Sequence, residues 1–143
     1  MTGPAASLEA RPAGIVLGLD PGTRKCGYAL VAAAGAPPLA LGIVPIDELE
    51  VRLRAVTAAQ PVAIAAIGRG TNAAVVTAAV RRMELPFALV DEYETTVLAR
   101  ARFFRDHPPR GWRRLIPLGM LLPDRPIDDY AALLIAERFL KGS

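Results

Sequence analysis

The sequence contains few of the residues that form disulfide bonds or bind zinc in small domains. Its 143 residues include one cysteine, Cys26, and one histidine, His107. A single cysteine excludes a disulfide scaffold and a cysteine-based zinc site. We expect Cys26 to be a small packed residue and His107 to be an ordinary loop residue.

Long hydrophobic runs are absent as well. No apolar stretch approaches the ~20 residues that cross a bilayer, and no charged-then-apolar signal peptide opens the chain. Apolar residues nevertheless make up 52% of the sequence, which excludes a disordered chain. These features predict a soluble, cytoplasmic protein without a membrane partner.

Lysine is scarce, because nearly all of the 17 basic residues are arginines. The window 99–114, "ARARFFRDHPPRGWRR", has a single acid and six of these arginines: Arg100, Arg102, Arg105, Arg110, Arg113 and Arg114. The planar fork of arginine suits phosphate, and interleaved aromatic residues fit a nucleic-acid contact. Trp112 either stacks on an unpaired base or anchors its own loop. The alternative for the whole window is a solvated loop with no partner.

Hydrophobic patterning predicts one domain over residues 14–143, preceded by a flexible tail over 1–13. Five strands are expected, at 15–19, 27–33, 39–44, 62–68 and 87–90. Helices are expected over 46–60, from the caps Thr71 and Asn72 to Met83, from about Glu94 into the arginine window, and over 128–140. A long loop separates the last two helices, from His107 to Pro126.

The order of these elements predicts an α/β fold. Three hairpin-linked strands, followed by alternating helices and strands, imply a five-stranded mixed sheet. Its first three strands would be antiparallel, and helices would cover both faces. That order is the ribonuclease H-like arrangement.

Acidic residues occur where the hydrophobic pattern does not predict them. Asp20 ends the first strand, Asp91 and Glu92 end the fifth, and Asp128 and Asp129 open the last helix.

A helical wheel of the last helix tests whether its acids point inward. It places Asp128 in the buried stripe with Ala132 and Ile135, and Asp129 towards the edge of that stripe. Glu137 falls on the far side.

Each acid also has an ordinary structural explanation. Asp20 could shape the following turn, Glu92 could be solvated, and Asp128 could cap its helix. Taken together, however, three such acids could converge at one edge of the sheet, where they would repel one another unless a cation neutralised them. Carboxylate oxygens select hard cations, so we expect Mg²⁺ or Mn²⁺, with two ions to clamp a phosphodiester.

Three stretches resemble motifs of the RuvC-like nucleases, in particular the YqgF (RuvX) family. "LGLDPGTRKCGYAL" (17–30) is similar to the first-strand motif, and "VDEYETT" (90–96) to the Asp-Glu-Arg motif with its Thr pair. "IDDYAALLIAERFL" (127–140) is similar to the closing Asp-x-x-Ala-Ala helix. The motifs occur in the family's order.

The resemblance implies a metal-dependent nuclease that acts on structured nucleic acid, as a Holliday-junction resolvase or a pre-16S rRNA nuclease. The substrate would be branched or single-stranded DNA or a ribosomal RNA precursor. Its metal ligands would be Asp20, Glu92 and Asp128, with Asp129 or Asp91 as a fourth. Beside the arginine window, the residues expected to contact the substrate are Thr23, Arg24, Lys25, Arg69 and Thr95.

The chain departs from the family pattern at two places. Gly68-Arg69-Gly70 replaces Gly-Leu-Pro, and Tyr93 replaces the arginine of the Asp-Glu-Arg motif. Two other functions stay open. One is a nucleic-acid-binding relative without turnover, and the other is an actin-like ATPase, which would need a second domain to close over its nucleotide. Either a monomer or a homodimer fits the nuclease.

Overall fold

The computed structural model describes residues 14–91, 95–117 and 120–142, so the predicted tail lies outside the described residues. The central sheet has five strands: β1 (Ile15–Pro21), β2 (Lys25–Val31), β3 (Ala40–Pro45), β4 (Val62–Gly68) and β5 (Phe87–Val90). They lie in the order β3-β2-β1-β4-β5. The first three are antiparallel, whereas β4 runs parallel to β1 and β5 parallel to β4. The predicted mixed sheet is confirmed.

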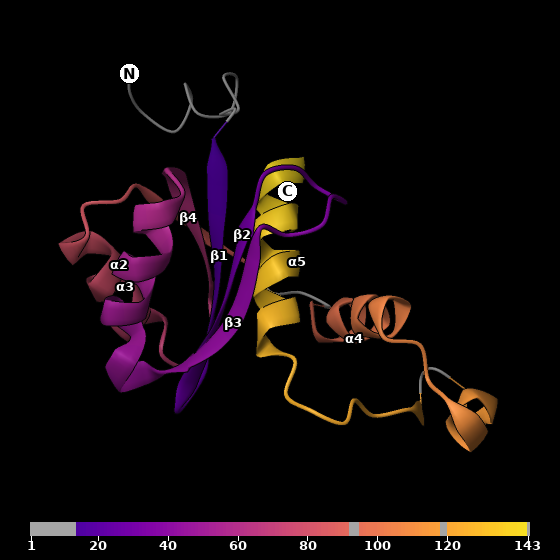
Figure 1. The fold of residues 1–143 in the computed structure, drawn as a ribbon. Helices are drawn as coiled ribbons and strands as arrows, with labels where there is room; N and C mark the ends of the chain where they lie inside the picture. The colour runs from indigo at the N-terminus through magenta and orange to yellow at the C-terminus, as the bar shows by residue number, and fades with distance from the viewer. Residues whose placement is uncertain (1–13, 92–94, 118–119, 143) are drawn as a thin grey trace.

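Helices cover both faces of this sheet, as predicted (Figure 1). A 3₁₀ turn, η1 (Ile46–Glu48), leads into α2 (Leu49–Ala59), and α2 and α3 (Ala73–Arg82) lie on one face. Helix α5 (Asp128–Lys141) lies on the other face, and α4 (Thr95–Asp106) packs on α5 rather than on the sheet. The long loop contains a second 3₁₀ turn, η2 (Gly111–Leu115). None of the described helices is long and apolar enough to cross a membrane.

Strand β1 is buried on both sides, because it is the central strand and helices cover each face. Val16 belongs to the core beneath α5. Its neighbours Leu17 and Leu19 belong to a second core, beneath α2 and α3, where they join Leu53. Since side chains alternate along a strand, Gly18 and Asp20 point to the α5 side with Val16.

The β1–β2 hairpin is tighter than the sequence predicted. Strand β1 continues to Pro21, which pairs with Cys26, and the turn is closed by a 3.0 Å hydrogen bond from the Gly22 N–H to the Lys25 carbonyl. Strand β2 therefore begins two residues before the expected start. Asp20 consequently lies within the ladder, opposite Gly27, rather than after the strand.

Helix α5 approaches β1 and β2 at two glycines. A Cβ on Gly18 would overlap the carbonyl oxygen of Ala132, and a Cβ on Gly27 would overlap the carbonyl oxygen of Asp128. The obstructing atoms are backbone atoms, which cannot move away by a rotamer change. Any side chain at these two positions would therefore push α5 away from the sheet.

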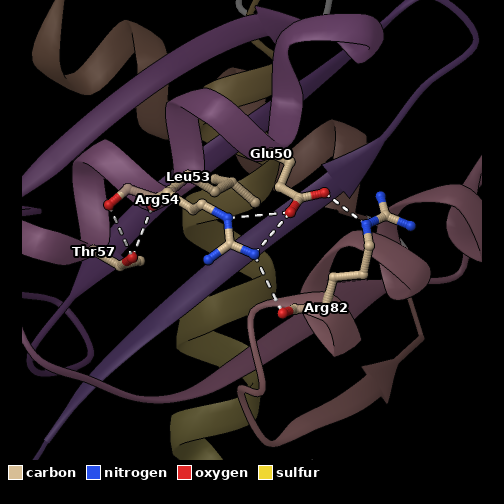
Figure 2. A network of polar contacts seen from close by, with 5 residues as sticks. All are labelled: Glu50, Leu53, Arg54, Thr57 and Arg82. Atoms are coloured by element: carbon tan, nitrogen blue, oxygen red, sulfur yellow. Dashed lines mark hydrogen bonds and ion pairs between the residues drawn. The ribbon is translucent and has the colours of Figure 1, made fainter.

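On the opposite face, a polar network joins α2 to α3 (Figure 2). The Glu50 carboxylate accepts hydrogen bonds from Arg82 Nε at 2.7 Å and from Arg54 Nη2 at 2.8 Å. Arg54 also donates to the Arg82 carbonyl at 3.2 Å. These donors, Arg82 first, lower the pKa of Glu50 below its ordinary value. The network is exposed to solvent, so we expect it to orient the two helices more than to stabilise them.

We predict that Gly18→Ala lowers the free energy of unfolding by at least about 1–3 kcal/mol, the usual range for overpacking. Alanine is not a worse strand residue than glycine, so the loss would come from the clash with α5. Urea unfolding measures it. Gly35→Asn is the control for adding a side chain without a clash: Gly35 has open space around it, and its φ of +83° strains Asn less than most other residues, so a smaller loss is expected. Equal stability of wild type and Gly18→Ala would contradict the close approach.

Candidate functional site

Asp20 lies at the carboxyl end of β1, on the face that α5 covers. Its strand position is set by pairing with Gly27, and its side chain is half-buried. The opposite face at this point is filled by apolar side chains such as Leu19. Asp20 is thus held on a rigid strand at the edge of the core.

Asp128 begins α5 directly above the residue that pairs with Asp20. Its carbonyl lies against Gly27, whose missing side chain leaves room for the helix end. Asp128 is half-buried. Residues more than 100 positions apart in the chain therefore meet at one end of the sheet.

The thiol of Cys26 reports on the charge at this end of the sheet. Its pKa is raised to about 12, mainly by burial. The carboxylates of Asp20 and Asp128 raise the pKa further, whereas a backbone hydrogen bond involving Asp20 lowers it. Both carboxylates therefore act on one buried group. Cys26 is packed in the core beneath α2 and α3, as its solitary occurrence predicted.

The third predicted ligand, Glu92, lies outside the described residues, as does Tyr93. Within the part of the chain that is described, no three His, Cys, Asp or Glu side chains lie close enough together to hold a metal ion. The donor set observed there is the pair Asp20 and Asp128. Hard oxygen ligands on one face of a sheet edge fit Mg²⁺ or Mn²⁺ in chemistry, and a third carboxylate would have to come from outside the described ranges.

The two predicted fourth ligands both have cationic partners. Asp91 is exposed and its Oδ1 lies 3.1 Å from Arg69 Nε. Asp129 Oδ1 lies 3.4 Å from Arg125 Nη1 and accepts the Tyr130 N–H at 2.9 Å.

The helical wheel of α5 was wrong on three acids. Asp129 is 5% exposed and Asp128 only half-buried, the reverse of the prediction. Glu137, predicted on the far side, is 4% exposed. The wheel assumed that the sheet alone covers α5. Since α4 packs against a second side of the helix, its buried arc is wider than one stripe.

Arg102 and Glu137 form the buried ion pair of that second interface. Arg102 Nη1 donates to Oε1 and Oε2 of Glu137 at 3.0 and 3.1 Å, and Glu137 also accepts the Gly35 N–H at 3.0 Å. The side chains are 10% and 5% exposed. Arg102 was predicted to contact the substrate, and the structure places its guanidinium in this enclosed ion pair between α4 and α5. The periodicity of the helix, with Ala99 and Phe103 also buried, is the signal that could have shown it.

The remaining arginines of the window lie nearer the surface. Arg105, Arg110 and Arg114 are exposed, whereas Arg100 and Arg113 are half-buried. Trp112 is 72% exposed, so it does not anchor its loop by burial. Thr95 is the first residue of α4.

The β1–β2 turn carries the other predicted contacts. Thr23 and Arg24 are exposed there, and Lys25 is half-buried at the start of β2. All three lie at the same end of the sheet as Asp20.

Asn72 holds this turn in place, a role the sequence did not predict. Its Nδ2 donates to the carbonyls of Gly22 at 2.7 Å and Thr23 at 2.9 Å. It was expected to cap α3, but its side chain makes no capping hydrogen bond. The local sequence around an Asn before a helix is the same whether its side chain caps the helix or bonds to a distant turn. Only the folded chain brings the turn within its reach.

The strand order and the comparisons with known proteins define the fold class of this chain. The strand order and the helices on both faces make this a ribonuclease H-like fold. No protein-family model and no curated protein sequence matches the chain.

The solved structures it resembles include RuvC of Thermus thermophilus. One such structure superposes with a TM-score of 0.55 and 18% identity, covering 90% of this chain and 97% of that chain. Another, RuvC in complex with a Holliday junction substrate, gives 0.57 and 20%, covering 87% and 90%. The chain therefore has the fold of RuvC.

We predict that breaking the buried ion pair destabilises the protein strongly. Arg102→Met should lower the free energy of unfolding by about 3–5 kcal/mol, since it leaves the Glu137 charge buried without its partner. The double variant Arg102→Met, Glu137→Met should lose less. Arg105→Met on the same helix is the control: its contact to Asp106 is 3.7 Å long and exposed, so about 0.5 kcal/mol or less is expected. Equal losses for Arg102→Met and Arg105→Met would contradict this account.

We also predict that Cys26 resists alkylation in the native protein. Near pH 8.5 an unperturbed thiol is about half ionised, whereas Cys26 stays protonated because its pKa is raised to about 12. The folded protein keeps the thiol proton to a higher pH than the unfolded chain does. The contribution of the thiol to the free energy of unfolding therefore has its full value below the unfolded pKa and falls as the pH rises towards the folded pKa. Mass spectrometry after iodoacetamide treatment measures the reaction.

Substitutions at the two aspartates connect this thiol to the site. Asp20→Asn and Asp128→Asn should each lower the pKa of Cys26, followed by the ultraviolet absorbance of its thiolate in a pH titration, whereas Asp47→Asn, an exposed acid in η1, should not. A native rate equal to that of the denatured chain would contradict the burial. An unchanged Cys26 pKa in both site variants would contradict the shared location of the carboxylates.

Proposed function

We propose that the protein is a divalent-metal-dependent nuclease that hydrolyses phosphodiester bonds in structured nucleic acid. The observation that carries this proposal is the meeting of Asp20 and Asp128 at one end of the sheet, where Gly27 brings the first turn of α5 against the strand pair. Asp20, Asp128 and Glu92 would hold two Mg²⁺ or Mn²⁺ ions, with Glu92 assigned from its sequence motif.

The chemistry of this end of the sheet favours a cation. Two carboxylates at the same end of the sheet would repel each other, and a divalent ion held between them would turn that repulsion into attraction. When bound, such ions activate a water and stabilise the leaving oxygen of a phosphodiester. The contribution of the chain is to hold the two acids on rigid elements, a strand and a helix start.

The substrate we propose is branched DNA or a ribosomal RNA precursor. The Thermus thermophilus RuvC structure with a Holliday junction substrate supports the first, through the shared fold. Exposed Arg24 and Thr23 in the turn that Asn72 anchors would contact the strand next to the metal ions. The exposed arginines of the window, Arg105, Arg110 and Arg114, would contact phosphates further away.

We predict that cleavage of branched DNA or of a pre-16S rRNA fragment requires Mg²⁺ or Mn²⁺ and is lost in Asp20→Asn and Asp128→Asn. In the metal-free protein, Asp128→Asn should raise the melting temperature, because it removes charge repulsion. The rise in melting temperature on adding Mn²⁺ should shrink, since fewer ligands hold the ion. A cleavage assay and thermal unfolding with and without Mn²⁺ measure these effects.

Glu84→Gln serves as the control, because it removes one carboxylate charge from an exposed position just before β5, at the opposite end of the sheet. It should keep both cleavage and the Mn²⁺ shift. If Asp20→Asn cleaved as fast as wild type in preparations free of host nucleases, the proposed metal site would be refuted. Binding of junctions without cleavage under any metal condition would favour a relative without turnover.

A further inference from the structure

A pocket of about 490 Å³ lies between the carboxyl-terminal end of α4 and the segment that leads into α5. Its lining includes Phe103, His107, Arg110, Arg113 and Arg125. The volume is in the range of pockets that take small organic groups. Neither Asp20 nor Asp128 lines it, so among the described residues the pocket is separate from the carboxylate pair.

One wall of the pocket is aromatic. Phe103 is buried, and the His107 ring stacks on it with centroids 4.6 Å apart and planes 18° from parallel. The Arg125 guanidinium lies over the Phe103 ring, 5.1 Å from its centroid. His107 itself is exposed, which leaves a flat ring at the pocket surface for a planar group to stack on.

The pocket lining carries more positive than negative charge, with three arginines against the two acids Asp106 and Asp124. Arg110 and Arg113 form no ion pair with a described carboxylate, and Arg113 Nη2 donates only to the Leu122 carbonyl, at 2.7 Å. Of the two acids in the lining, Asp106 accepts a hydrogen bond from Tyr130 Oη at 3.0 Å, and Asp124 is exposed. Two guanidinium groups without a carboxylate partner among the described residues, beside a flat ring, fit a group that is both planar and anionic.

The pocket lies close to the proposed metal site. Arg125 in its lining contacts Asp129, the residue after Asp128, at 3.4 Å. Figure 1 shows the segment from η2 running past α4 to the start of α5. A strand that is cut at Asp20 and Asp128 would pass this pocket if it followed the segment that leads into α5.

We propose that this pocket binds one unstacked nucleotide of the nucleic-acid strand, with its phosphate on Arg110 and Arg113 and its base against His107. Its place beside the cut rests on the proposed nuclease function, but the binding itself requires no metal. The ligand class is thus a nucleoside phosphate unit within a chain, and unpaired strands at branches or bulges supply it.

The test measures binding of a short single-stranded oligonucleotide, as DNA and as RNA, to the full chain without divalent ions. A fluorescent adenine analogue reports base stacking, and an oligonucleotide with abasic sites reports phosphate contacts alone. Arg110→Gln and Arg113→Gln should each weaken binding about tenfold, the usual effect of losing one charge-assisted hydrogen bond. Because Arg110 makes no side-chain hydrogen bond to a described residue, Arg110→Gln tests the pocket even if Arg113→Gln disturbs the loop.

Arg81→Gln is the matched control, since it removes the same charge from an exposed position on α3, which covers the opposite face of the sheet. It should weaken binding much less. His107→Ala should weaken binding of the base-containing strand and leave the abasic strand unaffected. Equal effects of Arg113→Gln, Arg110→Gln and Arg81→Gln would overturn the proposal, because they would mean diffuse charge attraction rather than a pocket.

Two further outcomes separate the alternatives. A free nucleoside monophosphate should compete weakly; full competition at equal concentration would overturn the strand as the source of the nucleotide. Failure of metal-dependent cleavage together with intact pocket binding would refute the nuclease alone. Normal cleavage together with equal losses of oligonucleotide binding in the pocket and control arginine variants would refute the pocket alone.

Discussion

Helix α5 rests on β1 and β2 through Gly18 and Gly27, so that backbone meets backbone with no side chain between. This close approach determines where the first turn of the helix lies, and with it the position of Asp128 above the pair of Asp20 and Gly27. The tight β1–β2 turn lies at the same end of the sheet, and Asn72 holds it in place through hydrogen bonds to its carbonyls. The two acids are therefore positioned by main-chain geometry, which is stiffer than side-chain packing.

The same helix also has a second buried side, against α4. There the Arg102–Glu137 pair crosses the interface, and Glu137 additionally accepts the N–H of Gly35 in the β2–β3 connection. One carboxylate thus joins three segments of the chain. Docking α4 in this way places its carboxyl-terminal end, with Phe103 and His107, beside the segment that leads into α5. The pocket is a consequence of that docking.

Much of the fold followed from hydrophobic patterning. The bounds of β4 and β5 agree with the predicted strands, because Pro61, Pro86 and glycine punctuate them clearly. The ends of β1 and β2 were displaced by two residues, since the Pro21-Gly22 turn allows pairing up to the turn itself. The predicted burial of the acids on α5 was wrong, because a helical wheel of one helix does not include the packing of a second helix against it.

The sequence by itself determined the order of elements, the mixed sheet and the identity of the out-of-place acids Asp20 and Asp128, since these depend on local periodicity and on residue type. Only the tertiary structure decided which charges remain available. It enclosed Arg102 with Glu137, left Arg110 exposed, paired Asp91 with Arg69 and turned Asn72 from a cap into an anchor for the turn. The partner of a polar side chain is set by contacts between residues far apart in the chain, and no local pattern encodes those distances.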